Sequence, residues 1–104
     1  MDPATEQNSC AYVLVEIDIK DPVAYEEYKK LAPASIKQYG GRYVVRGGLV
    51  TVLEGEWNPP RIVILQFPSI EKAQQWWESP EYEAAKAMRL ASAQAKMIIL
   101  GGII

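Results

Sequence analysis

The side chains best suited to bind an anion are four arginines, Arg42, Arg46, Arg61 and Arg89. A guanidinium group grips a carboxylate or phosphate through two parallel hydrogen bonds, so two that converge on a pocket would hold an anionic ligand. Arg46 precedes a glycine pair, and Arg61 opens a strand after a loop. The alternative for each arginine is an ordinary ion pair, such as Arg61 with Glu54 across a hairpin.

Aromatic side chains could supply the walls of such a pocket. Trp76 and Trp77 are neighbours on a predicted helix, where side chains point about 100° apart, so one of them must border a cleft or an interface. A tryptophan beside a pocket offers a flat apolar wall and one N–H donor. Trp57 lies in the loop 55–60 and could close the mouth, and Tyr82 is a further wall candidate. Alternatively, these rings fill the core or a dimer interface.

Acid–base chemistry falls to carboxylates or tyrosines, because the chain has no histidine. The candidate catalytic groups are Glu54 and Tyr82. Burial raises the pKa of a carboxyl group and a nearby arginine lowers it, so Glu54 beside Arg61 is either a poised base or a paired structural ion. The sequence favours the structural ion. Without histidine, Ser-His-Asp and Cys-His catalysis are excluded, and the absence of metal-ligand clusters and phosphate-binding glycine loops predicts no metal and no cofactor.

Composition limits the class of protein. A chain of 104 residues, 49% hydrophobic, is one domain, for which we expect a flexible tail over residues 1–9 and a single domain over residues 10–104. The net charge of −2 argues against nucleic-acid binding. No apolar run approaches the ~20 residues that span a bilayer, and residues 1–9 do not read as a secretory signal. A lone cysteine, Cys10, cannot form an internal disulfide, so we expect a cytoplasmic protein.

The elements that must position these residues follow the order strand, helix, strand, strand, helix pair, strand. The helices are predicted to begin after Asp21, Ser69 and Ser79, and Pro33 is expected to kink or split the first. A loop over 55–60 places Val52 opposite Val63. The predicted strands are residues 10–19, 43–46 with a continuation at 49–53, 61–67 and 96–100. The predicted register also pairs Val50 with Leu65 and Glu54 with Arg61.

This order favours an α+β, ferredoxin-like βαββαβ fold with a four-stranded antiparallel sheet and helices on one face. The strands are apolar at both odd and even positions, so the second face of the sheet is apolar as well. An uncovered apolar face is a liability for a monomer. The same face of another copy would cover it, which predicts a homodimer with sheets packed face to face.

Three segments carry a family resemblance: GGRYVVRGG, LEGEWNPPR, and LQFPSIEKAQQWWESPEYEAA with a following arginine. They resemble the bacterial domain-of-unknown-function family 1330, in the dimeric α/β-barrel superfamily, over residues 12–102. The resemblance implies a ferredoxin-like protomer that dimerises through its sheet, and no assigned reaction. Its relatives include cofactor-independent monooxygenases of aromatic substrates, muconolactone isomerases, and haem-binding proteins whose histidine ligand this chain lacks. The positions that match the family motif are Arg46, Glu54, Trp57, Arg61, Ser79, Tyr82 and Arg89.

The leading hypothesis is therefore a cytoplasmic homodimer that binds a small anionic metabolite, with an aromatic ligand as one option, between sheet and helices. Arg46 and Arg89 would hold the acid, with Arg61 as a further binding residue. Trp76 and Tyr82 would form the wall. Any reaction would be of isomerase or monooxygenase type without a cofactor. The alternative is a non-catalytic, ligand-sequestering or regulatory dimer module, in which the centre is filled and the arginines pair with Glu54, Glu78 or Glu83.

Overall fold

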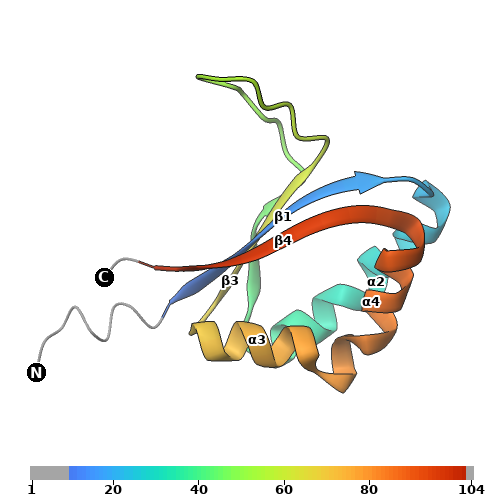
Figure 1. Cartoon of the computed structure of the whole chain (residues 1–104). Helices are drawn as coiled ribbons and strands as arrows, with labels where there is room; N and C mark the ends of the chain where they lie inside the picture. The colour runs from blue at the N-terminus through green and yellow to red at the C-terminus, as the bar shows by residue number, and fades with distance from the viewer. Residues whose placement is uncertain (1–9, 103–104) are drawn as a thin grey trace, which may run out of the picture.

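A computed structural model describes residues 10–102 as one antiparallel sheet with three helices on one of its faces (Figure 1). The sheet order is β2-β3-β1-β4, with every neighbouring pair antiparallel. The predicted ferredoxin-like α+β fold is thus confirmed, while the predicted tail over 1–9 lies outside the described residues. The elements are β1 (Ala11–Ile19), α2 (Pro22–Gln38), β2 (Arg42–Arg46), β3 (Ile62–Phe67), α3 (Ile70–Glu78), α4 (Pro80–Ser92) and β4 (Ala93–Gly101).

The helix starts follow the capping residues of the sequence. The side chains of Asp21, Ser69 and Ser79 each accept a hydrogen bond from a backbone N–H of the following helix, at 3.1 Å. Pro33, however, does not split the first helix, because α2 runs unbroken for 17 residues. Proline removes only the one bond that its own N–H would make, to the carbonyl four residues earlier. That carbonyl belongs to Lys29 and finds another donor, described below.

The predicted hairpin register is wrong, because residues 49–53 form no strand. Instead β2 itself pairs with β3, placing Arg46 opposite Val63 and Tyr43 opposite Leu65, with a bulge between Tyr43 and Val45. The physical reason lies at Gly47, whose φ of 71° is in the left-handed region and turns the chain out of the sheet. We call residues 48–60, which project from the sheet on the side away from the helices, the arm (Figure 1).

The last strand also differs from the prediction. It begins at Ala93, directly after α4, rather than at Lys96, and pairs with β1 along its whole length. A helix can pass straight into a strand here because Ser92 accepts two backbone hydrogen bonds, from the N–H groups of Lys20 and Asp21 at 2.8 and 2.9 Å. The edge strand is therefore nine residues long.

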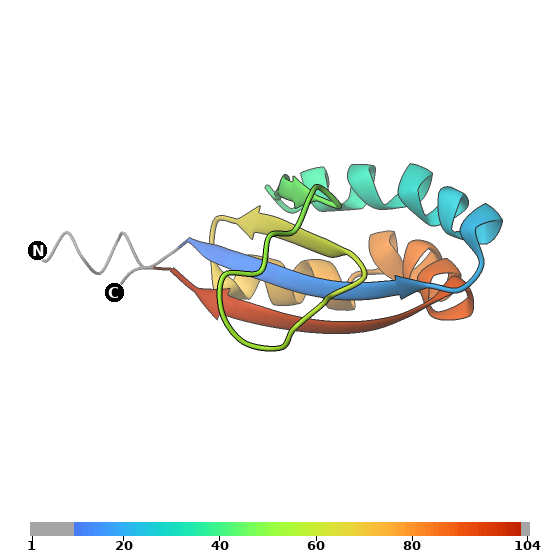
Figure 2. The ribbon, with the colours of Figure 1, turned by 90° about the horizontal axis from the view of Figure 1, so that it is seen from above.

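The two faces of the sheet have different surroundings. Odd-numbered residues of β1, such as Val13 and Ile17, are buried beneath the helices together with Phe67 and Trp76. The opposite face, which we call the open face, carries Tyr12, Leu14, Ile64, Ile98 and Leu100 and has no helix on it. Seen from above, only the arm crosses it (Figure 2). Apolar residues on both faces match the prediction from the strand sequences.

Candidate functional site

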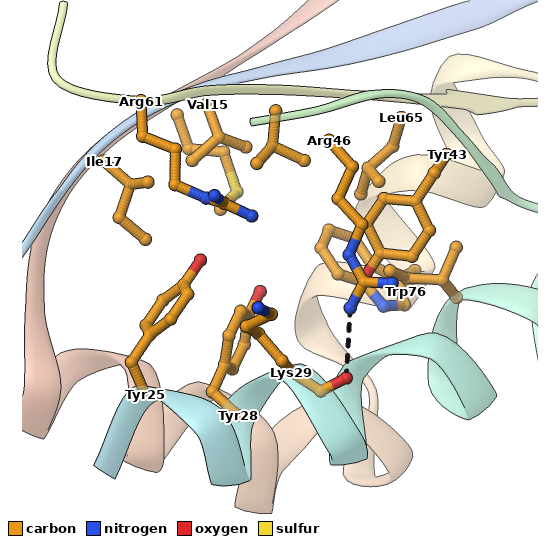
Figure 3. Close-up of a pocket in the computed structure, with 13 residues that line it drawn as sticks. Val15, Ile17, Tyr25, Tyr28, Lys29, Tyr43, Arg46, Arg61, Leu65 and Trp76 are labelled. Carbon is orange, nitrogen blue, oxygen red and sulfur yellow. Dashed lines mark hydrogen bonds between the residues drawn. The ribbon is translucent and has the colours of Figure 1, made fainter. Parts of the chain in front are cut away.

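A cleft opens between α2 and the helix-covered face of the sheet (Figure 3). Tyrosines of α2 point up into it, and two arginines from the strands above reach down towards them. We call this space the central cleft. Its lining residues are Val15, Ile17, Tyr25, Tyr28, Lys29, Ile36, Tyr43, Arg46, Arg61, Val63, Leu65, Trp76 and Met97.

Arg46 lies at the mouth of the central cleft, where β2 ends. Its guanidinium packs over the ring of Tyr43, with Cζ 4.4 Å from the ring centroid, a favourable cation–π geometry. Its Nη2 donates a hydrogen bond to the backbone carbonyl of Lys29 at 3.2 Å (Figure 3). This carbonyl is available because Pro33, four residues later, has no N–H to offer. Pro33 thus leaves the Lys29 carbonyl free, and this carbonyl accepts the hydrogen bond that holds Arg46 in place.

Arg61 lies deeper in the central cleft, at the start of β3. Its guanidinium carbon is 5.9 Å from the ring centroid of Tyr25. Its Nε is buried and has no hydrogen-bond partner among the described residues, an uncommon state for a buried donor. Gly47 leaves the room for this side chain, because a Cβ at Gly47 would overlap the guanidinium. Arg61 therefore has one buried donor, Nε, that is unsatisfied by the described residues.

Tyrosine hydroxyls supply the neutral polar groups of the central cleft. Burial raises the pKa of Tyr25, Tyr28 and Tyr43 above the usual tyrosine value, and Arg61 offsets part of this for Tyr25. All three hydroxyls therefore keep their protons at neutral pH. The Tyr28 hydroxyl lies 2.9 Å from that of Tyr82, which accepts a hydrogen bond from Arg89 Nε at 3.2 Å.

Of the predicted binding residues, the structure brings Arg46, Arg61 and Trp76 into the central cleft. Trp76 is buried, and its Nε1 donates to Ser35 Oγ at 3.1 Å, which fixes the ring as a wall. Tyr82 is completely buried behind Tyr28 rather than at the cleft surface.

The structure places the other predicted residues elsewhere. Glu54 and Trp57 belong to the arm, and Glu54 is exposed. Trp57 Nε1 donates to Glu16 Oε1 at 3.1 Å, on the open face and away from the cleft. Among residues 10–102 the ion pairs all use lysines, so the expected Glu54–Arg61 pair does not form.

Arg89 lines a second cavity, bounded by α3, α4 and the edge strand β4, which we call the edge cavity. Trp77 lines it too and is 43% exposed, whereas its neighbour Trp76 is 1% exposed, as the angle between adjacent helical positions requires. Lys86 Nζ lies 3.8 Å from the ring centroid of Trp77. Arg46 and Arg89 therefore serve two different cavities, although the sequence suggested that both would hold one acid.

Sequence reasoning missed the polar groups that α2 contributes. Tyr25 and Tyr28 are three residues apart on the apolar stripe of the helix, and that spacing indicated core residues only. Pro33 could have indicated a polar site on this helix, because it has no N–H for the Lys29 carbonyl. That carbonyl is then free to accept a hydrogen bond from another side chain, close to Tyr25 and Tyr28 in the helix. Lys29, which supplies that carbonyl, also lines the cleft.

The central cleft is narrow. Only about 20 Å³ is open to water, roughly the space of one water molecule. Any larger ligand must displace some of the lining side chains. Within residues 10–102 no cluster of three or more His, Cys, Asp or Glu side chains could hold a metal ion. In the same part of the chain, no helix has the length and hydropathy to cross a membrane.

The sequence profile of a family described as a domain of unknown function, DUF1330, matches residues 10–103. The chain belongs to this family. Its sequence matches no curated protein.

Solved structures show the same fold at low sequence identity. The RPA0582 protein of unknown function from Rhodopseudomonas palustris has 17% identity and a TM-score of 0.73, covering 93% of this chain and 85% of its own. SnoaB, a cofactor-independent oxygenase from Streptomyces nogalater, has 9% identity and a TM-score of 0.63, covering 92% and 95%. A provisionally assigned antibiotic biosynthesis monooxygenase from Nitrosomonas europaea has 16% identity and a TM-score of 0.55, covering 92% of both chains.

Proposed function

We propose that this DUF1330 protein binds a small anionic metabolite with an aromatic ring in the central cleft, and that it works as a homodimer. The observation that carries the proposal is the pair Arg46 and Arg61. Both guanidinium groups line one cleft, and neither has a carboxylate partner among the described residues. A carboxylate bound between them would satisfy both, including the unpartnered Nε of Arg61.

The remaining walls suit an aromatic body. Trp76 and Tyr43 contribute aromatic walls, and the protonated hydroxyls of Tyr25 and Tyr28 can donate to a ligand oxygen. The hydrogen bond of Arg46 to a backbone carbonyl is a single neutral-acceptor bond near solvent, so a ligand carboxylate would compete well for it. Ligand entry would then swing Arg46 aside and open the cleft.

The chemistry that fits is proton transfer or cofactor-free oxidation of an activated substrate. The likeness to SnoaB, a cofactor-independent oxygenase, supports this class. Among residues 10–102 no carboxylate lines the central cleft, so its acid–base groups are the tyrosines and Lys29. Tyr82 would act through Tyr28, to which it is hydrogen bonded. Glu54 and Trp57 could serve a cleft only if a partner subunit's arm brought them there.

The proposed dimer would pack the open faces of two copies together. Leu49 and Leu53 of the arm are 103% and 95% exposed, and Ile98 on the open face is 51% exposed, which is unfavourable for a lone protomer. The substitution Ile98→Asp should convert a dimer to a monomer in sedimentation equilibrium at micromolar concentration. Val23→Asp, on an exposed position of α2, is the matched control. A wild-type protein that sediments with the mass of one chain contradicts the dimer.

The non-catalytic module is the second candidate, and the narrowness of the central cleft favours it. A centre with room for about one water is what a filled regulatory domain would have. The experiment separates a cleft that binds ligand from a filled regulatory domain: added acid stabilises the first and does not stabilise the second.

The deciding experiment is a thermal-shift screen of aromatic and aliphatic carboxylates against wild type, Arg46→Ala and the control Arg42→Ala. Arg42 lies on the same strand but outside the cleft. An acid that stabilises wild type should lose most of its stabilisation with Arg46→Ala and keep it with Arg42→Ala. Equal stabilisation of all three proteins would overturn the assignment of the site.

A further inference from the structure

The edge cavity is a separate space with its own charged group. It has a volume of about 340 Å³, within the size range of small-molecule sites. It lies between α3, α4 and β4, and shares only Trp76 and Met97 with the central cleft. Apart from Arg89, its lining is apolar or aromatic, including Trp77, Leu90 and Ile99.

Arg89 is the only charged residue of this lining, and it is buried, with 6% of its surface exposed. Among residues 10–102 it forms no ion pair, and its single hydrogen bond runs from Nε to the hydroxyl of Tyr82. A guanidinium has five N–H donors, so four, on the two terminal nitrogens, have no acceptor in the described chain. These nitrogens are not sealed from solvent, because the fully buried side-chain donor without a partner in the described chain is Arg61 Nε. Burying a cation without a partner is costly, and buried arginines are usually paired.

A role in helix stability does not account for this placement. Arg89 lies in the last turn of α4, where a cation interacts favourably with the helix dipole. An exposed position in the same turn would give that interaction without desolvating the charge. Leu90, the next residue, is 66% exposed, whereas Arg89 points inward. The inward direction therefore leaves the terminal nitrogens free to bind an anion inside the cavity.

We propose that the edge cavity is a second ligand site, which takes an aromatic carboxylic acid. The carboxylate accepts from the terminal nitrogens of Arg89, and the ring lies against Trp77 and the apolar lining of the cavity. A cavity whose described lining is apolar apart from one cation, Arg89, selects for one negative charge on an apolar body, rather than for a multiply charged phosphate or sugar phosphate. This inference stands apart from the proposed function, which rests on Arg46 and Arg61.

The site can be tested with naphthalene-2-carboxylate and its neutral amide as probes. Titration calorimetry is run in an Arg46→Met/Arg61→Met background, so that the central cleft contributes no binding. Adding Arg89→Met should weaken acid binding at least tenfold and leave amide binding unchanged. Leu90→Asp, at the exposed rim, should also weaken the acid and spare the amide, through repulsion, with little risk to folding. Equal acid affinity with and without Arg89 would overturn the site.

The three tryptophans provide a readout of location, because their indole N–H signals can be followed individually by NMR. Naphthalene-2-carboxylate should shift the signals of Trp76 and Trp77 and leave that of Trp57, on the arm, in place. A shift confined to Trp57 would overturn the site. So would a Trp77 signal that moves on dilution without the probe, since a second copy would then fill the cavity. If the Arg46→Met/Arg61→Met protein no longer binds the acid and the Trp77 signal never shifts, the acid binds only in the central cleft, and the second site is overturned.

Discussion

The substitution Tyr82→Phe tests whether the buried hydrogen-bond chain holds the interior together. The Tyr82 hydroxyl accepts from Arg89 Nε at 3.2 Å and lies 2.9 Å from the Tyr28 hydroxyl. Removing it leaves a buried charged donor without an acceptor, which costs about 1–3 kcal/mol, and deletes a second bond of about 0.5–1.5 kcal/mol. We therefore expect the free energy of unfolding to fall by about 2–4 kcal/mol.

The assay is urea unfolding at pH 7, followed by tryptophan fluorescence at one fixed protein concentration, since a dimer makes stability concentration-dependent. Tyr39→Phe is the matched control. The Tyr39 hydroxyl also donates a short hydrogen bond, to Glu81 Oε1 at 2.7 Å, but at an exposed site. Water replaces an exposed partner, so this control should lose less than about 1 kcal/mol.

A double-mutant cycle separates the bond from general packing effects. Tyr82→Phe leaves Arg89 Nε without an acceptor, and Arg89→Met removes this donor. The double variant should therefore be more stable than the sum of the two single changes predicts. The expected coupling between Arg89 and Tyr82 is about 1–2 kcal/mol. Additivity within about 0.5 kcal/mol would show that this hydrogen bond contributes nothing, and would refute the reasoning.

Three further predictions concern the backbone and the tyrosines. Pro33→Ala restores a helical N–H for the Lys29 carbonyl and should raise stability by about 1–3 kcal/mol in urea unfolding; a loss would contradict the freed-carbonyl argument. Gly47→Ala places alanine in the left-handed region and its Cβ against the Arg61 guanidinium. It should lower the free energy of unfolding by about 1–2 kcal/mol or more, and an unchanged melting temperature would exclude the clash. The pKa of Tyr28 is raised in the folded state, so stability is intact below pH ~10 and falls above it, where only the unfolded chain ionises. Tyr28→Phe should therefore reduce the alkaline slope of unfolding free energy against pH by up to about 1.4 kcal/mol per pH unit, and an unchanged slope would refute the assignment.

The parts of the fold that could be predicted are those set by local chemistry. Asp21, Ser69 and Ser79 each cap a helix because their short polar side chains reach a backbone N–H in the first turn. The strands are apolar at odd and even positions, which predicted apolar residues on the open face of the sheet. The structure places Leu14, Ile64 and Ile98 on that face, next to the charged pair of positions Glu16 and Lys96. These features depend on residues that are close in the sequence, or on the alternation of successive side chains between the two faces of a strand.

The site could not be predicted fully, because its geometry depends on one backbone angle. The sequence of residues 49–53 alternates in a way that is compatible with a strand, but the positive φ at Gly47 directs it away from the sheet. That single turn separates Glu54 from Arg61 and leaves the guanidinium of Arg61 without its expected partner. Local patterns carry no information about such a departure, since a bulge within the strand and an exit from it both use glycine.

Three arginines that line cavities have no acidic partner in the described chain. Arg46, Arg61 and Arg89 all line cavities, and within residues 10–102 none has a carboxylate partner, although the chain as a whole has more acids than bases. Unpaired cations lower the stability of a folded domain unless something compensates them. Water solvates the exposed Arg46, so a compensating charge matters most for buried Arg89 and for the buried Nε of Arg61, and no acid among residues 10–102 supplies it. A bound acid is the proposed source, and in the proposed dimer the arm of a second copy would be another; only the first depends on ligand concentration at fixed protein concentration.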